Sequence, residues 1–337
     1  MQKRKIFVTA SLIVGLIIFV IVLVQNFDIF LSLGKLNYIY LIPYLIVTFI
    51  IHSIHVLRWK LILHSHDKKF GFLRLLLYRT VGFSVSYFTP SAQIGGEPVR
   101  AWLLTRHNMR FHHSLSTVMI DKFMEVAINL MLGVIGVFFL ILKFTVSDDA
   151  IVLMTAALFF AVLGVLIYYR RMVKNKPFFS LFFRFSKQKK IVKIRRTIQK
   201  SEKMVSHFFN RKKKILLASL MLTLVNFVVM FFEYYFLFLI FGVDAEIGNL
   251  FMVIAVVAIS YIMPVPSGLG VMEFGQAGLF SFLSLKSSFG VGMSLIIRLR
   301  DSCIAVFGLI YLTFRGIKSL GLAKIKEKGK ITQKQFS

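Results

Sequence analysis

The sequence predicts an all-α polytopic membrane protein with about six transmembrane helices and two broken re-entrant helical hairpins in an inverted repeat. Hydrophobic residues make up 57% of the 337 residues, above the roughly 45–50% of soluble domains. Apolar runs recur along the chain, and Lys plus Arg outnumber Asp plus Glu by 42 to 14. This composition excludes a soluble globular enzyme. The single cysteine, Cys303, excludes an intrachain disulfide and a zinc site built from cysteines.

Six apolar runs approach or exceed the roughly 20 residues that a transmembrane helix needs. They lie at residues 6–24, 39–63, 116–142, 151–169, 215–241 and 290–314. The first run follows Lys3-Arg4-Lys5, as in a signal peptide, but residues 24–27 offer no small-residue cleavage site. We therefore expect this run to remain as a membrane anchor.

Two further apolar segments, residues 73–104 and 250–285, are interrupted near their centres by Pro and Gly. Each is too long for one span, so we expect two half-helices that meet at a loop inside the membrane. Both interruptions read Pro-Ser, five residues that include two glycines, and then Glu; the glutamates are Glu97 and Glu273. The flanking runs occur in the same order but cross in the opposite sense. This pattern predicts an inverted repeat, which transporters use to form two alternating faces; chance recurrence of a short motif is the alternative.

Charge predicts the orientation. With the amino terminus in the cytoplasm, 36 Lys and Arg residues fall in inside segments, whereas only Lys35, Lys143 and Lys286 fall outside. Positive charge accumulates in cytoplasmic loops, so both termini are expected inside. The expected organisation is a first membrane half at 1–169, a basic cytoplasmic segment at 170–214, a second membrane half at 215–314 and a basic tail at 315–337.

The basic segment has apolar residues at near-helical spacing between its Lys and Arg residues: Ile191, Ile194, Ile198, Val205 and Phe208. This pattern predicts an interfacial helix on the anionic lipids of the inner leaflet. A nucleic-acid patch is the alternative, but the segment has neither a stacking platform nor a recognisable nucleic-acid fold.

The broken segments also predict substrate-binding residues. Gly95, Gly96 and Pro98 favour the start of a half-helix, whose free N–H groups and positive dipole end bind phosphate or carboxylate. Glu97 and Arg100 lie in its first turn. The second hairpin offers the equivalent residues Ser267, Gly268, Gly270 and Glu273, and Arg298 is the expected counterpart of Arg100. The alternative is a packing kink in which each Glu caps backbone N–H groups.

Charged residues inside the apolar runs support this site: Asp121, Lys122, Glu125, Glu233, Arg300 and Asp301. A charge in a span usually faces a partner or a cavity. Asp121 and Glu125 share a helical face and need a cation, and Arg298 is spaced to pair with Asp301. Together these residues predict a polar cavity for a charged substrate, with structural ion pairs as the alternative.

Metal and cofactor sites are not predicted. The His pairs have no third ligand at a matching spacing. The chain also lacks a nucleotide-binding Gly-Lys-Ser/Thr loop and a Gly-x-Ser-x-Gly elbow.

Residues 95–104, Gly-Gly-Glu-Pro-Val-Arg-Ala-Trp-Leu-Leu, and residues 266–273, Pro-Ser-Gly-Leu-Gly-Val-Met-Glu, resemble a known family. It is the flippase-like membrane domain of bacterial lysylphosphatidylglycerol synthases, and the resemblance covers roughly residues 5–318. The resemblance implies lipid movement across the bacterial cytoplasmic membrane and a link to resistance against cationic antimicrobial peptides. Full synthases carry a soluble carboxy-terminal lysyltransferase domain, for which this chain has no room, so the resemblance does not imply lysyl transfer.

We therefore expect a multi-pass translocator of a phospholipid or another anionic or aminoacylated lipid, and a transporter rather than an enzyme. One alternative is a membrane partner of a phosphatidylglycerol lysyltransferase, or a protein of lipid-linked sugar metabolism. Another is a scaffold that acts through the basic segment at 170–214. The expected partners are a membrane lipid, anionic inner-leaflet lipids and a separate lipid-modifying enzyme; a homo-oligomer is compatible with the sequence, and no nucleic-acid partner is expected.

Overall fold

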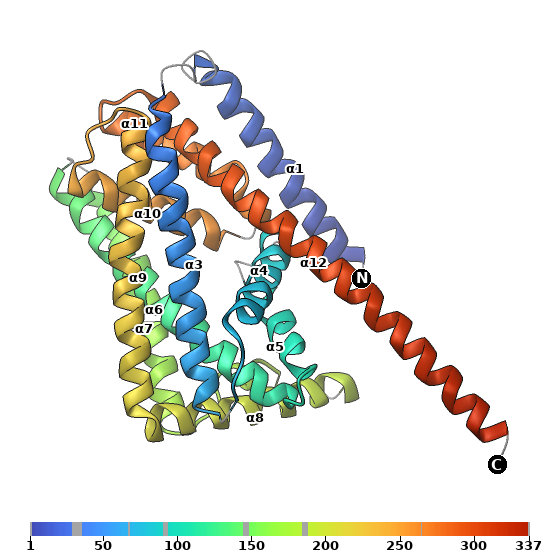
Figure 1. The fold of residues 1–337 in the computed structure, drawn as a ribbon. Helices are drawn as coiled ribbons and strands as arrows, with labels where there is room; N and C mark the ends of the chain where they lie inside the picture. The colour runs from blue at the N-terminus through green and yellow to red at the C-terminus, as the bar shows by residue number, and fades with distance from the viewer. Residues whose placement is uncertain are drawn as a thin grey trace.

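The computed structural model describes residues 2–28, 36–66, 68–89, 94–143, 148–183, 188–263 and 265–335, and the regular elements in these ranges are helices (Figure 1). The first half contains α1 (Gln2–Gln25), the short η2 (Tyr38–Tyr40), α3 (Leu41–His64), α4 (Phe72–Phe88), α5 (Glu97–Thr105), α6 (Phe111–Lys143) and α7 (Asp148–Val173). The remainder contains η3 (Phe179–Phe183), α8 (Lys189–Arg211), α9 (Lys213–Ile240), α10 (Ile247–Ile262), η4 (Pro266–Gly268), α11 (Val271–Phe282) and α12 (Ser287–Gln335).

The helices agree with the apolar runs. A helix covers each of the six expected spans, and three of these helices are long and apolar enough to cross a membrane: Tyr38–His64, Phe111–Phe139 and Lys213–Ile240. A count of six spans stays a prediction. The expected tail differs from the structure, because α12 continues as a helix through Gln335 and extends away from the other helices (Figure 1).

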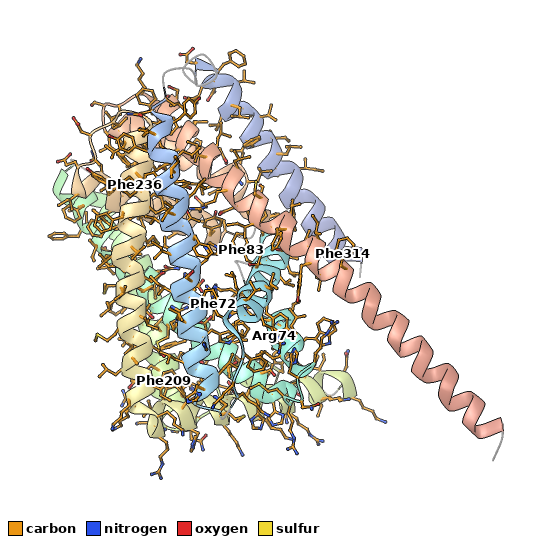
Figure 2. All side chains as sticks on the ribbon, in the orientation of Figure 1. Phe72, Arg74, Phe83, Phe209, Phe236 and Phe314 are labelled. Carbon is orange, nitrogen blue, oxygen red and sulfur yellow. The ribbon has the colours of Figure 1, made fainter. Side chains whose placement is uncertain are left out.

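Apolar side chains cover the outward faces of the bundle (Figure 2). Phe314 on α12 is 69% exposed, Phe160 on α7 is 68% exposed and Phe282 on α11 is 72% exposed. Water would make such a surface unfavourable, whereas lipid tails would cover it at no cost. The described part of the chain is thus built for a membrane.

Both broken segments form helical hairpins. In the first, α5 folds back against α4 so closely that a Cβ at Gly96 would lie 1.7 Å from the carbonyl oxygen of Gly82. In the second, α10 and α11 are joined through η4, where Ser267, Gly268 and Gly270 have positive φ angles of 53°, 63° and 78°. Residues 90–93 and Pro264, which belong to the two interruptions, lie outside the described residues.

The two hairpins belong to a repeat that covers four helices. The same separation of 176 residues joins His64 to Ile240, Glu97 to Glu273 and Phe111 to Ser287, so α3, α5 and α6 correspond to α9, α11 and α12. By the same separation α4 corresponds to α10. The long-range packing is reciprocal, because α3 packs against α9, α4 against α12, and α10 against α6. Asn37 N–H donates to the Ile240 carbonyl at 2.9 Å, so α3 and α9 are antiparallel.

Three helices lie outside this repeat. α1 packs against α11 and η4, and a Cβ at Gly270 would lie 2.5 Å from the carbonyl oxygen of Gly15. This helix therefore contacts the second hairpin, although it belongs to the first half in sequence. α7 and α8 pack against α6 and each other.

α8 lies across one end of the bundle (Figure 1). Val205 and Phe208 are buried against α6 and α7, so part of the apolar face expected on the lipid surface instead packs within the protein. Glu202, also buried, accepts hydrogen bonds from the N–H groups of Phe178 at 2.7 Å and Phe179 at 2.6 Å. The opposite face of α8 exposes a basic stripe: Lys189, Lys193, Arg196, Lys200, Lys203 and Arg211.

Candidate functional site

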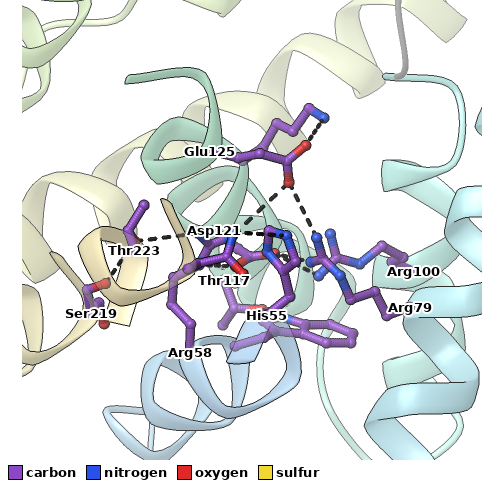
Figure 3. Close-up of polar contacts among 12 residues, drawn as sticks. His55, Arg58, Arg79, Arg100, Thr117, Asp121, Glu125, Ser219 and Thr223 are labelled. Atoms are coloured by element: carbon purple, nitrogen blue, oxygen red, sulfur yellow. Dashed lines mark hydrogen bonds and ion pairs between the residues drawn. The ribbon is translucent and has the colours of Figure 1, made fainter. Parts of the chain in front are cut away.

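The first charge cluster lies between α3, α4, α5 and α6 and is centred on Asp121 (Figure 3). Its members are Arg58, Arg79, Glu97, Arg100, Asp121, Lys122 and Glu125. Three arginines bind the fully buried Asp121 carboxylate: Arg58 at 2.8 Å, Arg79 at 2.9 Å and Arg100 at 2.8 Å. The expected need of Asp121 and Glu125 for a cation is thus met several times over.

The other members complete the cluster. Glu125 is 2.7 Å from Lys122 and 3.3 Å from Arg79, and Glu97 is 2.9 Å from Arg100. The Arg100 guanidinium also lies 4.2 Å from the centre of the Trp59 ring. Four cations face three carboxylates, so the first charge cluster has one excess positive charge.

The second charge cluster joins α9 and α12 and consists of Glu233, Arg300 and Asp301. Arg300 donates to Glu233 at 2.6 Å and to Asp301 at 2.9 Å. Thr48 on α3 donates to Glu233, and Tyr261 on α10 donates to Asp301. Two carboxylates face one cation here, so this cluster has one excess negative charge.

The third group is the hairpin clamp, in which Arg298 holds the second hairpin. Arg298 forms a two-point ion pair with Glu273 and also donates to the carbonyl oxygens of Gly268 at 2.9 Å and Ser267 at 3.3 Å. Glu273 accepts a hydrogen bond from Gly270 N–H at 2.9 Å. The predicted pairing of Arg298 with Asp301 is wrong, because the hairpin places Glu273 within reach of Arg298 while Arg300 and Tyr261 hold Asp301.

A cavity of about 220 Å³ lies between the first and second charge clusters. Arg79, Arg100, Lys122 and Glu125 line it from one cluster, and Glu233, Arg300 and Asp301 line it from the other. Other polar residues on its wall are His52, His55, Asn129, Asn226 and Tyr261. The cavity therefore has a cation-rich end and an end with excess negative charge.

The predicted site residues are distributed over these groups. Arg100 reaches the cavity, whereas the hairpin clamp residues are not part of its described lining. At the start of α5, Gly96 N–H donates to Ser86 and Glu97 N–H donates to the Ile94 carbonyl, while Pro98 has no N–H. An anion in the cavity would thus meet arginine and lysine side chains rather than these amides. The binding roles of Gly95, Gly96 and Glu97 stay predictions.

Sequence reasoning missed several members of the site. Arg58 and Arg79 had been counted among the cytoplasmic loop charges, but both are in the charge cluster around Asp121. Arg58 gave a usable indication, since it lies within the apolar run at 39–63. Thr48, Tyr261 and the cavity histidines have no pattern in the sequence that separates them from packing residues.

Comparisons with known proteins agree with this architecture. The family model described as the lysylphosphatidylglycerol synthase TM region matches residues 6–308. A UPF0104 membrane protein of Methanothermobacter thermautotrophicus is 22% identical over 293 residues, covering 80% of this chain and 82% of that protein. A second UPF0104 membrane protein, from Pyrococcus horikoshii, is 22% identical over 279 residues, covering 77% of this chain and 82% of that protein. No solved structure matches the chain. With most of its length matched by the family model, this membrane protein belongs to the lysylphosphatidylglycerol synthase TM region family.

Proposed function

We propose that this protein moves a lipid with a phosphate-bearing headgroup across the bacterial cytoplasmic membrane. The observation that carries the proposal is the cavity between the two charge clusters, with Arg79, Arg100 and Lys122 on its wall. A headgroup would enter the cavity while its acyl chains remain in the surrounding lipid.

The electrostatics of the cavity favour phosphate at the cation-rich end. Arginine forms bidentate, charge-assisted hydrogen bonds with phosphate oxygens. Arg79 and Arg100 already share Asp121, yet the first charge cluster keeps one excess positive charge. Arg100 Nε is buried and has no hydrogen-bond partner, so this donor is available to a ligand. A phosphate there would supply the missing negative charge.

The repeat supports movement rather than binding alone. Inverted repeats allow one half to rock against the other around a central site, so that the site opens to each side in turn. The cavity lies where the two halves meet, with α3, α4 and α6 on one side and α9, α10 and α12 on the other. This arrangement is what a translocator needs.

A scrambling assay in proteoliposomes tests the proposal. Fluorescent anionic, zwitterionic and aminoacylated lipids are compared in vesicles with the wild-type protein, Arg79→Gln and Arg74→Gln. Arg74 is on α4 as well but is exposed (Figure 2), so it provides a matched control. We expect Arg79→Gln to slow headgroup movement about tenfold, equivalent to roughly 1.4 kcal/mol, and Arg74→Gln to leave it unchanged.

Two outcomes would contradict the proposal. One is a folded wild-type protein that moves no lipid in this set, and the other is equal movement by the wild type and Arg79→Gln. The first outcome would favour the alternative role as a partner of a lipid-modifying enzyme.

A further inference from the structure

Three charged positions recur in both halves of the repeat, at the same separation of 176 residues. Glu97 corresponds to Glu273, Lys122 to Arg298, and Glu125 to Asp301. The other charges of the first cluster are not repeated, since Arg100 corresponds to Gln276 and Asp121 to Ile297. Each half thus places one cation on its long helix, with one carboxylate on the hairpin and another one turn further along the same helix.

The two cations have made different choices between their carboxylates. Lys122 Nζ is 2.7 Å from Glu125 on its own helix and 3.9 Å from Glu97 on the hairpin. Arg298 instead pairs with Glu273 on the hairpin, and Asp301 is held by Arg300 and Tyr261. The first hairpin is therefore loosely held by its cation, and the second is clamped.

This difference changes the cavity. Lys122, paired along its helix, lines the cavity, whereas Arg298, paired with the hairpin, is not part of the described lining. The Glu273 side chain is fully buried, while that of Glu97 is 13% exposed. A cation that clamps its hairpin is thereby withdrawn from the cavity, and its hairpin closes on it.

We propose that Lys122 and Arg298 are paired switches, and that the protein alternates between this state and its two-fold image. In the image, Lys122 clamps Glu97 while Arg298 turns to Asp301 and joins the cavity wall. The physical reason is that equivalent packing arrangements are available to both halves, so each can adopt what the other shows. Arginine clamps more strongly than lysine because it binds a carboxylate at two points, which favours the state seen here.

The inference rests on the proposed function for its purpose, because alternation is how the cavity would open to each side. It differs from a static pair of ion bridges in one consequence. Removing the second clamp must shift the protein toward the image, whereas removing the first must shift it the other way.

Side-specific labelling of a cavity cysteine tests this consequence. Ala258 lines the cavity, so Ala258→Cys is made in a Cys303→Ser background and reacted with a membrane-impermeant maleimide in vesicles of both orientations. The ratio of labelling from the two sides is measured for the parent, Glu97→Gln and Glu273→Gln. Both substitutions keep the side-chain shape and remove one charge.

We expect Glu273→Gln to shift the ratio about tenfold toward the side that is less reactive in the parent. Glu97→Gln should shift it the opposite way or increase the existing preference. Exchange of the cations, Lys122→Arg with Arg298→Lys, should reverse the preference. Shifts in the same direction for both glutamine variants, or an unchanged ratio in the exchange variant, would overturn the proposal.

Thermal unfolding of each variant checks that it is folded. Should Glu273→Gln fail to fold, Arg298→Lys replaces it, since it keeps the charge and loses the second contact point. The scrambling assay on the same vesicles separates the two proposals. Opposite labelling shifts without lipid movement would retain the switches and overturn the lipid substrate, and lipid movement without the shifts would do the reverse.

Discussion

Asp121 is the residue on which the first charge cluster depends. Its carboxylate is inaccessible to solvent and is bound by three guanidinium groups that come from three different helices, α3, α4 and α5. Burying one of these cations alone would carry a large desolvation cost, and the shared carboxylate offsets it. The Trp59 ring adds a cation–π contact to Arg100, and Trp59 Nε1 donates to Thr117 at 3.3 Å. A single side chain therefore joins four helices near the cavity.

We predict that Asp121→Asn destabilises the protein by about 3–5 kcal/mol, the usual cost of leaving a buried ionic partner unpaired. The neutral amide would leave the three arginines without their shared counter-charge. Thermal unfolding in detergent measures the effect, with Asp149→Asn on the exposed start of α7 as the control. Equal unfolding temperatures for the two variants would show that Asp121 does not stabilise the cluster.

At the scale of the elements, close backbone approaches hold the hairpins in place. Gly96 packs on Gly82, which brings α5 against α4. Between the halves, Gly308 on α12 packs on Thr80 of α4, and Gly136 on α6 packs on Ala255 of α10. Small residues allow such approaches, and in a membrane packing replaces the hydrophobic effect as the force between helices. These glycines position the charged side chains by fixing the helices that carry them.

Gly96→Ala should therefore displace α5, because the added methyl group would overlap the Gly82 backbone, which cannot move aside. We expect a loss of about 1–3 kcal/mol or more in unfolding free energy, together with reduced lipid movement. Gly164→Ala on α7 is the matched control, since its Cβ would meet nothing within 4 Å. It should be neutral or slightly stabilising. A Gly96→Ala protein that unfolds and transports like the Gly164→Ala protein would contradict the role of this contact.

At the scale of the whole molecule, basic residues gather at the end of the bundle where α8 lies (Figure 1). The basic stripe of α8 is exposed there, while Lys286 lies in the turn between α11 and α12 at the opposite end. Arg58 and Arg79 are withdrawn into the first charge cluster, but the remaining asymmetry still favours a cytoplasmic α8. We propose that the basic stripe contacts anionic lipid headgroups of that leaflet.

Cysteine labelling in intact cells tests this orientation. In a Cys303→Ser background, Lys286→Cys should react with a membrane-impermeant maleimide from outside. Lys200→Cys on the exposed face of α8 should react only after the membrane is permeabilised. The reverse pattern would place α8 outside and overturn the predicted orientation. Labelling of both positions in intact cells would instead show a mixed topology.

Local patterns predicted the helices and hairpins because they depend on residues close in sequence. The apolar runs at 39–63 and 215–241 became α3 and α9 within a few residues, and the glycines and prolines of 73–104 and 250–285 broke those segments as expected. The Pro-Ser and Glu pattern predicted the repeat, whose constant separation the helices then extended to α3, α4 and α6.

Partner choice depended on which helices meet. Arg58 and Arg79 lie 63 and 42 residues from Asp121, and only the packing of α3 and α4 on α6 brings them together. Arg298 and Asp301 have helical spacing, yet Arg298 binds Glu273, 25 residues away, because the hairpin presents both the carboxylate and backbone carbonyls. The sequence by itself thus determined the membrane character, the broken helices and which charges lie among them. The tertiary structure decided the ion pairs, the cavity between them and the attachment of α1 to the second hairpin, since these arise from contacts between segments far apart in the chain.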